Sequence, residues 1–179
     1  MADLDGDGDN DVAFAHEYRG DFYIYWNRGD GISFDTSTAF VNAGGGTLDI
    51  NAVDIDYDGD LDLLQLRKIY DSLNVARNGG SGDFTRNEAY SLQPEPRSLV
   101  VTDFDNDGYA DIATASWTYG SVTVLLNNGD GTLKPPRICP TGYAPQWICS
   151  ADFDGDGDMD IATANELGQA KRIVVDKEN

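Results

Sequence analysis

The stretch from Asp103 to Ser116 reads DFDNDGYADIATAS, an acidic turn that leads directly into a short apolar segment. Its first nine residues carry aspartate at positions 1, 3, 5 and 9 and glycine at position 6. The same pattern begins at Asp3, Asp54 and Asp152, so four copies occur at intervals of 51, 49 and 49 residues. A repeat of about 50 residues has the length of four short strands with their turns, which predicts the blades of a β-propeller.

A second marker keeps a constant distance from the first. Asn27, Asn78 and Asn127 each open a glycine-containing turn 24 residues after the start of an acidic motif. In the fourth unit this offset falls on Asp176, close to the last residue. The constant offset indicates that each unit is one supersecondary element, repeated along the chain.

The third unit shows how one repeat divides into strands. Residues 98–102, 111–116, 121–126 and 133–139 are β-branched or alternating segments between Gly, Asn and Asp turns, which predicts four strands. Pro135 and Pro136 suit a strand at the outer edge. The first unit has no room for its first strand, and the fourth has strands predicted at 147–150, 160–164 and 169–175 only, so the expected counts are three, four, four and three.

These counts define the expected organisation. The fold class is all-β, a β-propeller built of four-stranded antiparallel blades with the first and last repeats incomplete. We expect a single propeller-type repeat domain over residues 1–179, with units of about 1–47, 48–97, 98–145 and 146–179. A closed ring protects its strand edges. We therefore expect the chain to be part of a larger propeller, or to complete its ring with another copy through the incomplete terminal blades.

The composition excludes several classes of partner. The chain has 12 lysines and arginines against 32 aspartates and glutamates, a net charge of −20. So few basic residues cannot neutralise a row of phosphates, which excludes nucleic acid and anionic membrane surfaces. Apolar runs are too short to predict membrane insertion. No signal peptide is visible, because the acidic motif begins at Asp3, and we interpret Met1 as an introduced start or an internal boundary.

The chemistry of the acidic turn predicts a hard dication. Calcium takes six to eight oxygen ligands, and short aspartate side chains at alternate positions of a tight loop aim carboxylates at one point. Position 7 adds a backbone carbonyl, and glycine at position 6 permits the sharp bend. An EF-hand needs a glutamate at position 12, where this chain has Phe14, Gln65, Thr114 and Thr163. Magnesium fits such a cage poorly, and zinc prefers Cys or His, of which the chain has one histidine.

A family resemblance rests on the acidic motif, the IATA segment that follows it, the VLLNNGDGTL run at 124–133 and TGYAP at 141–145. By these features the chain resembles FG-GAP repeats, also called VCBS-type repeats. Such repeats build the α-subunit propeller of integrins and occur in bacterial surface proteins. The resemblance implies that the loop between the first two strands of each blade binds calcium, about four ions in all. Together with the carbonyl at position 7, the expected ligands are Asp3, Asp5, Asp7, Asp9, Asp11, Asp54, Asp56, Asp58, Asp60, Asp62, Asp103, Asp105, Asp107, Tyr109, Asp111, Asp152, Asp154, Asp156, Asp158 and Asp160.

Strand order predicts which loops share an end of each blade. The acidic loops and the Gly-rich turns should lie together, and the loops at 16–19, 68–71, 117–120 and 143–146 should lie at the opposite end, where aromatic and polar residues suit a protein or glycan ligand. The single histidine, His16, has no nucleophile motif beside it, so we expect no enzyme. Cys139 and Cys149 fit free thiols or a disulfide.

The function expected from these features is a calcium-stabilised extracellular or cell-surface scaffold for adhesion or ligand recognition. A lectin-like propeller and an accessory or catalytic propeller of a polysaccharide-degrading enzyme remain alternatives, as does an array with no ligand besides calcium. Extracellular calcium modules bind at about 10⁻⁴–10⁻³ M, which suits external rather than cytosolic calcium.

Overall fold

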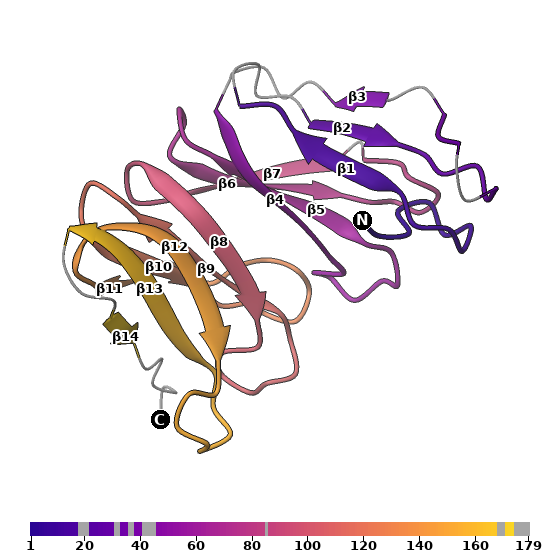
Figure 1. Ribbon diagram of the computed structural model, residues 1–179. Helices are drawn as coiled ribbons and strands as arrows, with labels where there is room; N and C mark the ends of the chain where they lie inside the picture. The colour runs from indigo at the N-terminus through magenta and orange to yellow at the C-terminus, as the bar shows by residue number, and fades with distance from the viewer. Residues whose placement is uncertain are drawn as a thin grey trace. The chain divides into compact units, whose positions relative to one another are not determined.

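The computed structural model describes residues 1–17, 22–30, 33–35, 38–40, 46–84, 86–167 and 171–173. In these ranges the secondary structure is all β, with no helix (Figure 1). The strands are, in chain order, β1 (Val12–Ala15), β2 (Phe22–Tyr25), β3 (Thr38–Phe40), β4 (Thr47–Val53), β5 (Asp62–Arg67), β6 (Ser72–Arg77), β7 (Arg86–Ser91), β8 (Pro96–Thr102), β9 (Asp111–Ser116), β10 (Ser121–Leu125), β11 (Arg137–Pro140), β12 (Tyr143–Ala151), β13 (Asp160–Leu167) and β14 (Lys171–Ile173).

The strands form four antiparallel sheets in which sequence neighbours are always spatial neighbours. Their orders are β1-β2-β3, β4-β5-β6-β7, β8-β9-β10-β11 and β12-β13-β14. Such up-and-down sheets follow from short turns between successive strands. The predicted all-β fold class and the predicted counts of three, four, four and three strands are confirmed within the described residues.

By chain contacts the protein divides into two compact units, Met1–Ser91 and Leu92–Asn179. In the second unit, alternate residues of β9 face opposite sides of the sheet, as a pleated strand requires. Ala113 and Ala115 lie on the side that packs against the sheet β12–β14, together with Phe104 from the acidic loop. Ile148 and Ile161 of β12 and β13 complete this core.

The first unit repeats the arrangement with other side chains. Phe22 and Ile24 of β2 are fully buried and pack against Leu63 and Ala76 of the sheet β4–β7. Leu4 occupies the place in its acidic loop that Phe104 has in the third loop, and it belongs to the same core. In these two loops the second residue of the acidic motif is therefore an anchor that holds the loop to a hydrophobic core.

Some strand boundaries differ from those predicted. The strand predicted at 133–139 is reduced to β11, because Pro135 and Pro136 have no N–H to donate and only an isolated bridge forms, at Leu133. β12 begins at Tyr143 rather than at 147, with an irregular register between Pro145 and Trp147. Of the strand predicted at 169–175, only 171–173 lies within the described residues.

The two cysteines are free thiols. Cys139 in β11 is partly buried against the second unit's core, and Cys149 in β12 is exposed. Their strands do not pair, since β11 pairs with β10 and β12 pairs with β13.

Candidate metal centres

The acidic motifs that begin at Asp3, Asp54, Asp103 and Asp152 form loops 1 to 4. Loop 1 lies directly before β1, and loops 2, 3 and 4 each join the first two strands of their sheet. The first aspartate closes each loop. Asp103 accepts a hydrogen bond through Oδ2 from the N–H of Gly108 at 2.9 Å. The equivalent bonds to Asp3, Asp54 and Asp152 measure 3.0, 3.1 and 3.0 Å. Glycine at position 6 adopts positive φ in all four loops, between 91° and 101°, as predicted from the sharp bend. A side chain at this position would be strained.

The carboxylate at position 5 orients the second half of the loop. Asp107 accepts from the N–H of Tyr109 at 2.9 Å, an Asx-type turn. The same bond recurs in the other three loops at 2.9, 3.0 and 2.9 Å. Position 7 is thereby held in one conformation. The backbone carbonyl of position 7 as a metal ligand stays a prediction.

The carboxylate at position 9 is the buried member of each loop. Asp111 accepts from the N–H of Phe104 at 2.9 Å through one oxygen and from the N–H of Asn127 at 2.8 Å through the other. Asp11 makes the same two bonds, at 2.9 and 2.8 Å. Burial raises the pKa of Asp111 to about 6, although these hydrogen bonds act to lower it. Burial raises the pKa of Asp62 in the same way, also to about 6. A nearby cation would favour the charged form of both groups.

The structure brings three carboxylates of every loop close enough to share one ion. One oxygen of each lies within 4.8 Å of the others. The groups are positions 1, 3 and 9 in loops 1, 3 and 4, and positions 1, 3 and 5 in loop 2. They are Asp3, Asp5 and Asp11; Asp54, Asp56 and Asp58; Asp103, Asp105 and Asp111; and Asp152, Asp154 and Asp160.

Buried oxygens inside the loops fit a dication. Oδ1 of Asp54, of Asp56 and of Asp105 is buried without a hydrogen-bond partner in the part of the chain that the structure describes. A buried carboxylate oxygen without a partner is costly unless a cation satisfies it. All-oxygen donor sets are those that calcium prefers. The residues present therefore fit such an ion.

The Asn at the start of each Gly-rich turn clamps that turn to the acidic loop, a role that sequence reasoning did not assign. Asn127 donates through Nδ2 to the carbonyl of Ala110 at 3.2 Å and accepts from the N–H of Gly129 at 2.9 Å. Asn27 and Asn78 make equivalent bonds. The constant offset of 24 residues was the signal for this clamp. The bonds also confirm, in the first three sheets, that the acidic loop and the Gly-rich turn share one end of the sheet.

Side chains at position 7 pack against the glycine of the clamped turn. Gly129 has a φ of 86°, and a Cβ added there would lie 2.7 Å from the ring of Tyr109. We expect Gly129→Val to lower the free energy of unfolding by about 1–3 kcal/mol from backbone strain alone, with a steric cost in addition. Urea unfolding measures the loss. Tyr109→Ala in the same chain should recover the steric part only, and full recovery would contradict the backbone argument.

The carboxylates of loop 2 lie beside a buried arginine of β6. Arg77, of which 4% of the side chain is exposed, lies 3.3 Å from Asp56, 3.4 Å from Asp62 and 3.5 Å from Glu88. The equivalent positions in units 1 and 3 hold Trp26 and Leu126. The guanidinium lies between Asp56, which belongs to the carboxylates gathered in loop 2, and Asp62, which does not. In loop 3, Lys134 lies 3.5 Å from Asp105, and it is more exposed than Arg77.

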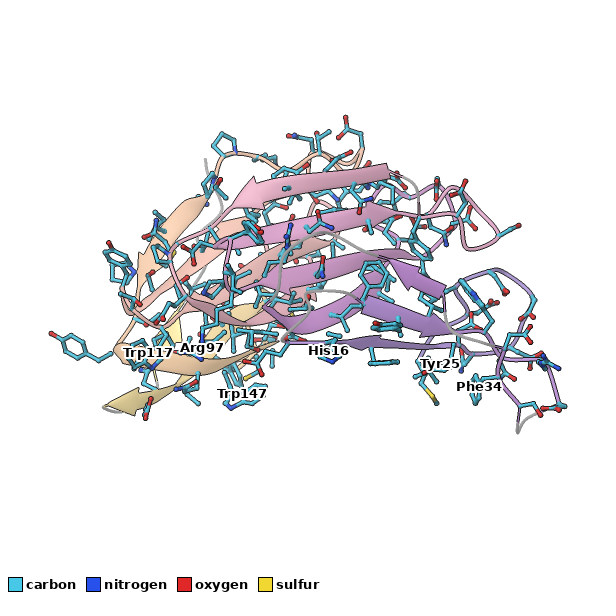
Figure 2. The ribbon with its side chains drawn as sticks, turned by 90° about the horizontal axis from the view of Figure 1, so that it is seen from above. His16, Tyr25, Phe34, Arg97, Trp117 and Trp147 are labelled. Carbon is cyan, nitrogen blue, oxygen red and sulfur yellow. The ribbon has the colours of Figure 1, made fainter. Side chains whose placement is uncertain are left out.

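The opposite end of the second unit carries aromatic and polar residues, as predicted. Trp117 donates through Nε1 to Glu166 at 3.1 Å, and Gln146 donates to the same carboxylate oxygen at 2.8 Å. These bonds lower the pKa of Glu166, and the bond from Trp117 has the larger effect. Arg97 lies over the Trp117 ring at 5.5 Å, and Figure 2 shows the two side chains next to each other.

Beside this network, Tyr119 and Tyr143 border a cleft of about 200 Å³, whose remaining walls are Gly120 and residues 140–142. The N–H of Thr141 donates to the carbonyl of Gly120 at 2.7 Å and fixes the two loops together. In the first unit, Tyr18 and Arg19 of the predicted 16–19 loop lie outside the described residues.

Up-and-down antiparallel sheets of three or four strands, with an acidic loop at the same place in each repeat, define a propeller-type repeat protein. The chain matches the FG-GAP-like repeat over residues 3–64 and 103–163, and it belongs to this family. A search of curated proteins found no match.

Two solved structures share the fold. A lectin of Agrocybe aegerita, described as specifically recognising non-reducing terminal N-acetylglucosamine, aligns with a TM-score of 0.64 at 24% identity, over 96% of this chain and 50% of the lectin. BBS1N, solved in complex with ARL6DN and soaked with lead, aligns with a TM-score of 0.66 at 17% identity, over 95% of this chain and 50% of that chain. This chain therefore spans about half the length of either, and at these identities the likeness shows the fold alone. Among the described residues, no helix is long and apolar enough to cross a membrane.

Proposed function

We propose that the chain is a calcium-stabilised binding module of the extracellular space or the cell surface, used for adhesion or ligand recognition. The observation that carries the proposal is that each of four loops gathers three carboxylates around one point. A bound calcium ion supplies positive charge at that point. The loops are held to the sheets by their own hydrogen bonds, and the ion would remove the repulsion between their carboxylates.

Membership of the FG-GAP-like family and the open, partly exposed loops support a location outside the cell. Extracellular modules bind calcium at about 10⁻⁴–10⁻³ M, a range that external calcium saturates. We propose a binding role and no enzymatic one, because the carboxylates that catalysis would need are engaged in the loops.

Equilibrium dialysis against isotope-labelled calcium tests this function. We expect about four ions per chain at millimolar calcium, with dissociation constants in the extracellular range and little competition from equal magnesium. Stoichiometric binding at nanomolar calcium would contradict the extracellular role, and no binding at millimolar calcium would contradict the calcium role.

Arg77 makes loop 2 the weakest of the four sites in this proposal, because the guanidinium competes with a cation for Asp56 and Asp62. We expect Arg77→Met to raise the calcium affinity of one site by about tenfold, which corresponds to about 1.4 kcal/mol. Calcium titration followed by calorimetry measures it. Lys134→Met is the matched control with a smaller effect, since Lys134 is more exposed. Equal affinities for wild type and Arg77→Met would contradict the competition.

A second candidate function is glycan binding at the Tyr119–Tyr143 cleft. Its support is the cleft itself, bordered by two exposed tyrosine rings beside the Trp117–Glu166–Gln146 network, together with the lectin fold neighbour. Exposed aromatic rings stack on the apolar faces of sugars, and fixed amide and carboxylate groups bind hydroxyls.

A glycan array with the calcium-loaded protein tests this second function. We expect binding to one class of terminal sugar, lost in Tyr119→Ala and Tyr143→Ala and kept in Ile69→Ala, an exposed residue of the first unit. Binding that persists in both tyrosine variants would exclude this cleft.

A further inference from the structure

Sheets within each unit pack face to face by one rule. In the second unit, Phe104, Ala113 and Val124 of the sheet β8–β11 cover Ile148 and Ile161 of the sheet β12–β14. We call the surface of a sheet that meets the next sheet in the chain its forward face, and the surface that meets the preceding sheet its back face.

The first unit follows the same rule. Phe22 and Ile24 lie on the forward face of the sheet β1–β3, and Leu63 and Ala76 lie on the back face of the sheet β4–β7. Forward-to-back packing is therefore the contact that joins consecutive sheets within each unit.

The forward face of the sheet β12–β14 has the same kind of residues, and no sheet formed by the described residues covers it. Phe153 is 49% exposed, whereas its equivalent Phe104 is fully buried. Trp147 is 69% exposed, whereas its equivalent Ser98 is buried. Cys149, Ala162 and Ala164 pair across β12 and β13 beside Trp147 and line an apolar hollow of about 210 Å³.

The back face of the sheet β1–β3 is also uncovered in the described part of the chain, and it is also aromatic. Phe14 stacks on Tyr23 at 5.2 Å and on Tyr25 at 5.5 Å between ring centroids. Phe14 and Tyr25 are exposed, whereas Gln65 and Ala76, their equivalents in the sheet β4–β7, are fully buried. Figure 2 shows Tyr25 and Trp147 at the surface of their sheets.

A sheet face that stays in contact with water needs to be polar for a repeat protein to remain soluble. Both outer faces here carry larger aromatic residues than the equivalent inner positions, which is the composition of a covered interface. We propose that two copies of this chain associate head to tail, so that the forward face at Trp147 of each copy packs on the back face at Phe14 and Tyr25 of the other.

A second copy is the occupant that the structure favours. Forward-to-back packing of a second copy continues the contact already present inside each unit. The solved structures with this fold are about twice as long as the aligned chain, so two copies supply the length of one such protein. A head-to-tail interface closes when the copies complete a ring, which limits the assembly to a defined size.

The mass in solution is the first test. Sedimentation equilibrium of the calcium-loaded protein should give twice the chain mass of 19.4 kDa. Tyr25→Glu and Trp147→Glu should each give the single-chain mass, and Tyr119→Glu, an exposed residue on neither face, should stay at twice the mass. A single-chain mass for the wild type would overturn the proposal, as would a mass that grows without limit with concentration.

Mixing the two variants separates head-to-tail from face-to-itself association. The Tyr25→Glu copy keeps its forward face and the Trp147→Glu copy keeps its back face, so an equimolar mixture should form a weaker heterodimer through one intact interface. No association in the mixture, while the wild type is a dimer, would overturn the head-to-tail geometry.

Cys149 reports on coverage of the forward face directly. Its labelling by a thiol reagent, identified by peptide mass to separate it from Cys139, should be at least about tenfold slower in the wild type than in Tyr25→Glu. The two residues lie on different sheets, so this effect requires a second copy. Circular dichroism of each variant checks folding, and equal labelling rates in folded proteins would overturn the proposal.

Discussion

Replacing Asp111 by alanine should lower the free energy of unfolding by about 3–5 kcal/mol even in the absence of calcium. Its two oxygens accept hydrogen bonds from the N–H groups of Phe104 and Asn127, and the carboxylate is fully buried. Hydrogen bonds to a charged group contribute about 1.5–3 kcal/mol each, and both donors would be left unpaired. The total free energy of unfolding of a folded domain is about 5–15 kcal/mol, so urea unfolding resolves the change readily.

Asp107→Ala is the matched control within the same loop. Asp107 is exposed and accepts one loop hydrogen bond, from the N–H of Tyr109. In excess chelator we expect this variant to lose less than about 1 kcal/mol. If Asp107→Ala and Asp111→Ala lost the same stability in chelator, the structural role of position 9 would be wrong.

Replacing Phe104 by alanine should cost a similar amount, about 3–5 kcal/mol, for a different reason. Phe104 comes from the acidic loop and is fully buried in the core of the second unit, among Ala113, Val124 and Ile161. Removing its ring leaves a cavity that the two facing sheets cannot close. The loop would also lose its anchor, so calcium binding at loop 3 should weaken together with stability.

Phe153 has the equivalent position in loop 4 and supplies the comparison. At protein concentrations low enough for a single chain, Phe153→Ala should cost less than about 1 kcal/mol, because the ring is half exposed. Urea unfolding of both variants at such a concentration compares the two positions. Equal losses for Phe104→Ala and Phe153→Ala would show that the anchor role does not depend on the packed neighbour.

Much of this architecture could be predicted from local pattern. The spacing of the acidic motif placed β9 at its observed bounds, and the bend at position 6 followed from Gly108 alone. The offset to Asn127 indicated a fixed unit, and the structure explains it as a clamp between two turns. Local patterns succeed here because each repeat brings its own loop, turn and core residues.

Other features depend on contacts distant in sequence. The motif makes Asp62 equivalent to Asp111, yet Asp62 faces the buried Arg77 and is not among the three carboxylates gathered in loop 2. Likewise, Phe104 and Phe153 are identical in local sequence terms and differ in burial, because only one of them has a sheet of described residues packed on it. A repeated local pattern does not predict which copies have another sheet packed against them.

Thermal unfolding of one sample in excess chelator, in millimolar magnesium and in millimolar calcium tests the central claim most directly. Each independent site adds RT ln(1 + [L]/Kd), about 1.4 kcal/mol when calcium is at about ten times its Kd. Four such sites predict a large rise in melting temperature that is specific to calcium. Melting curves that coincide in chelator and in calcium would contradict the account, since the acidic loops would then be solvated turns.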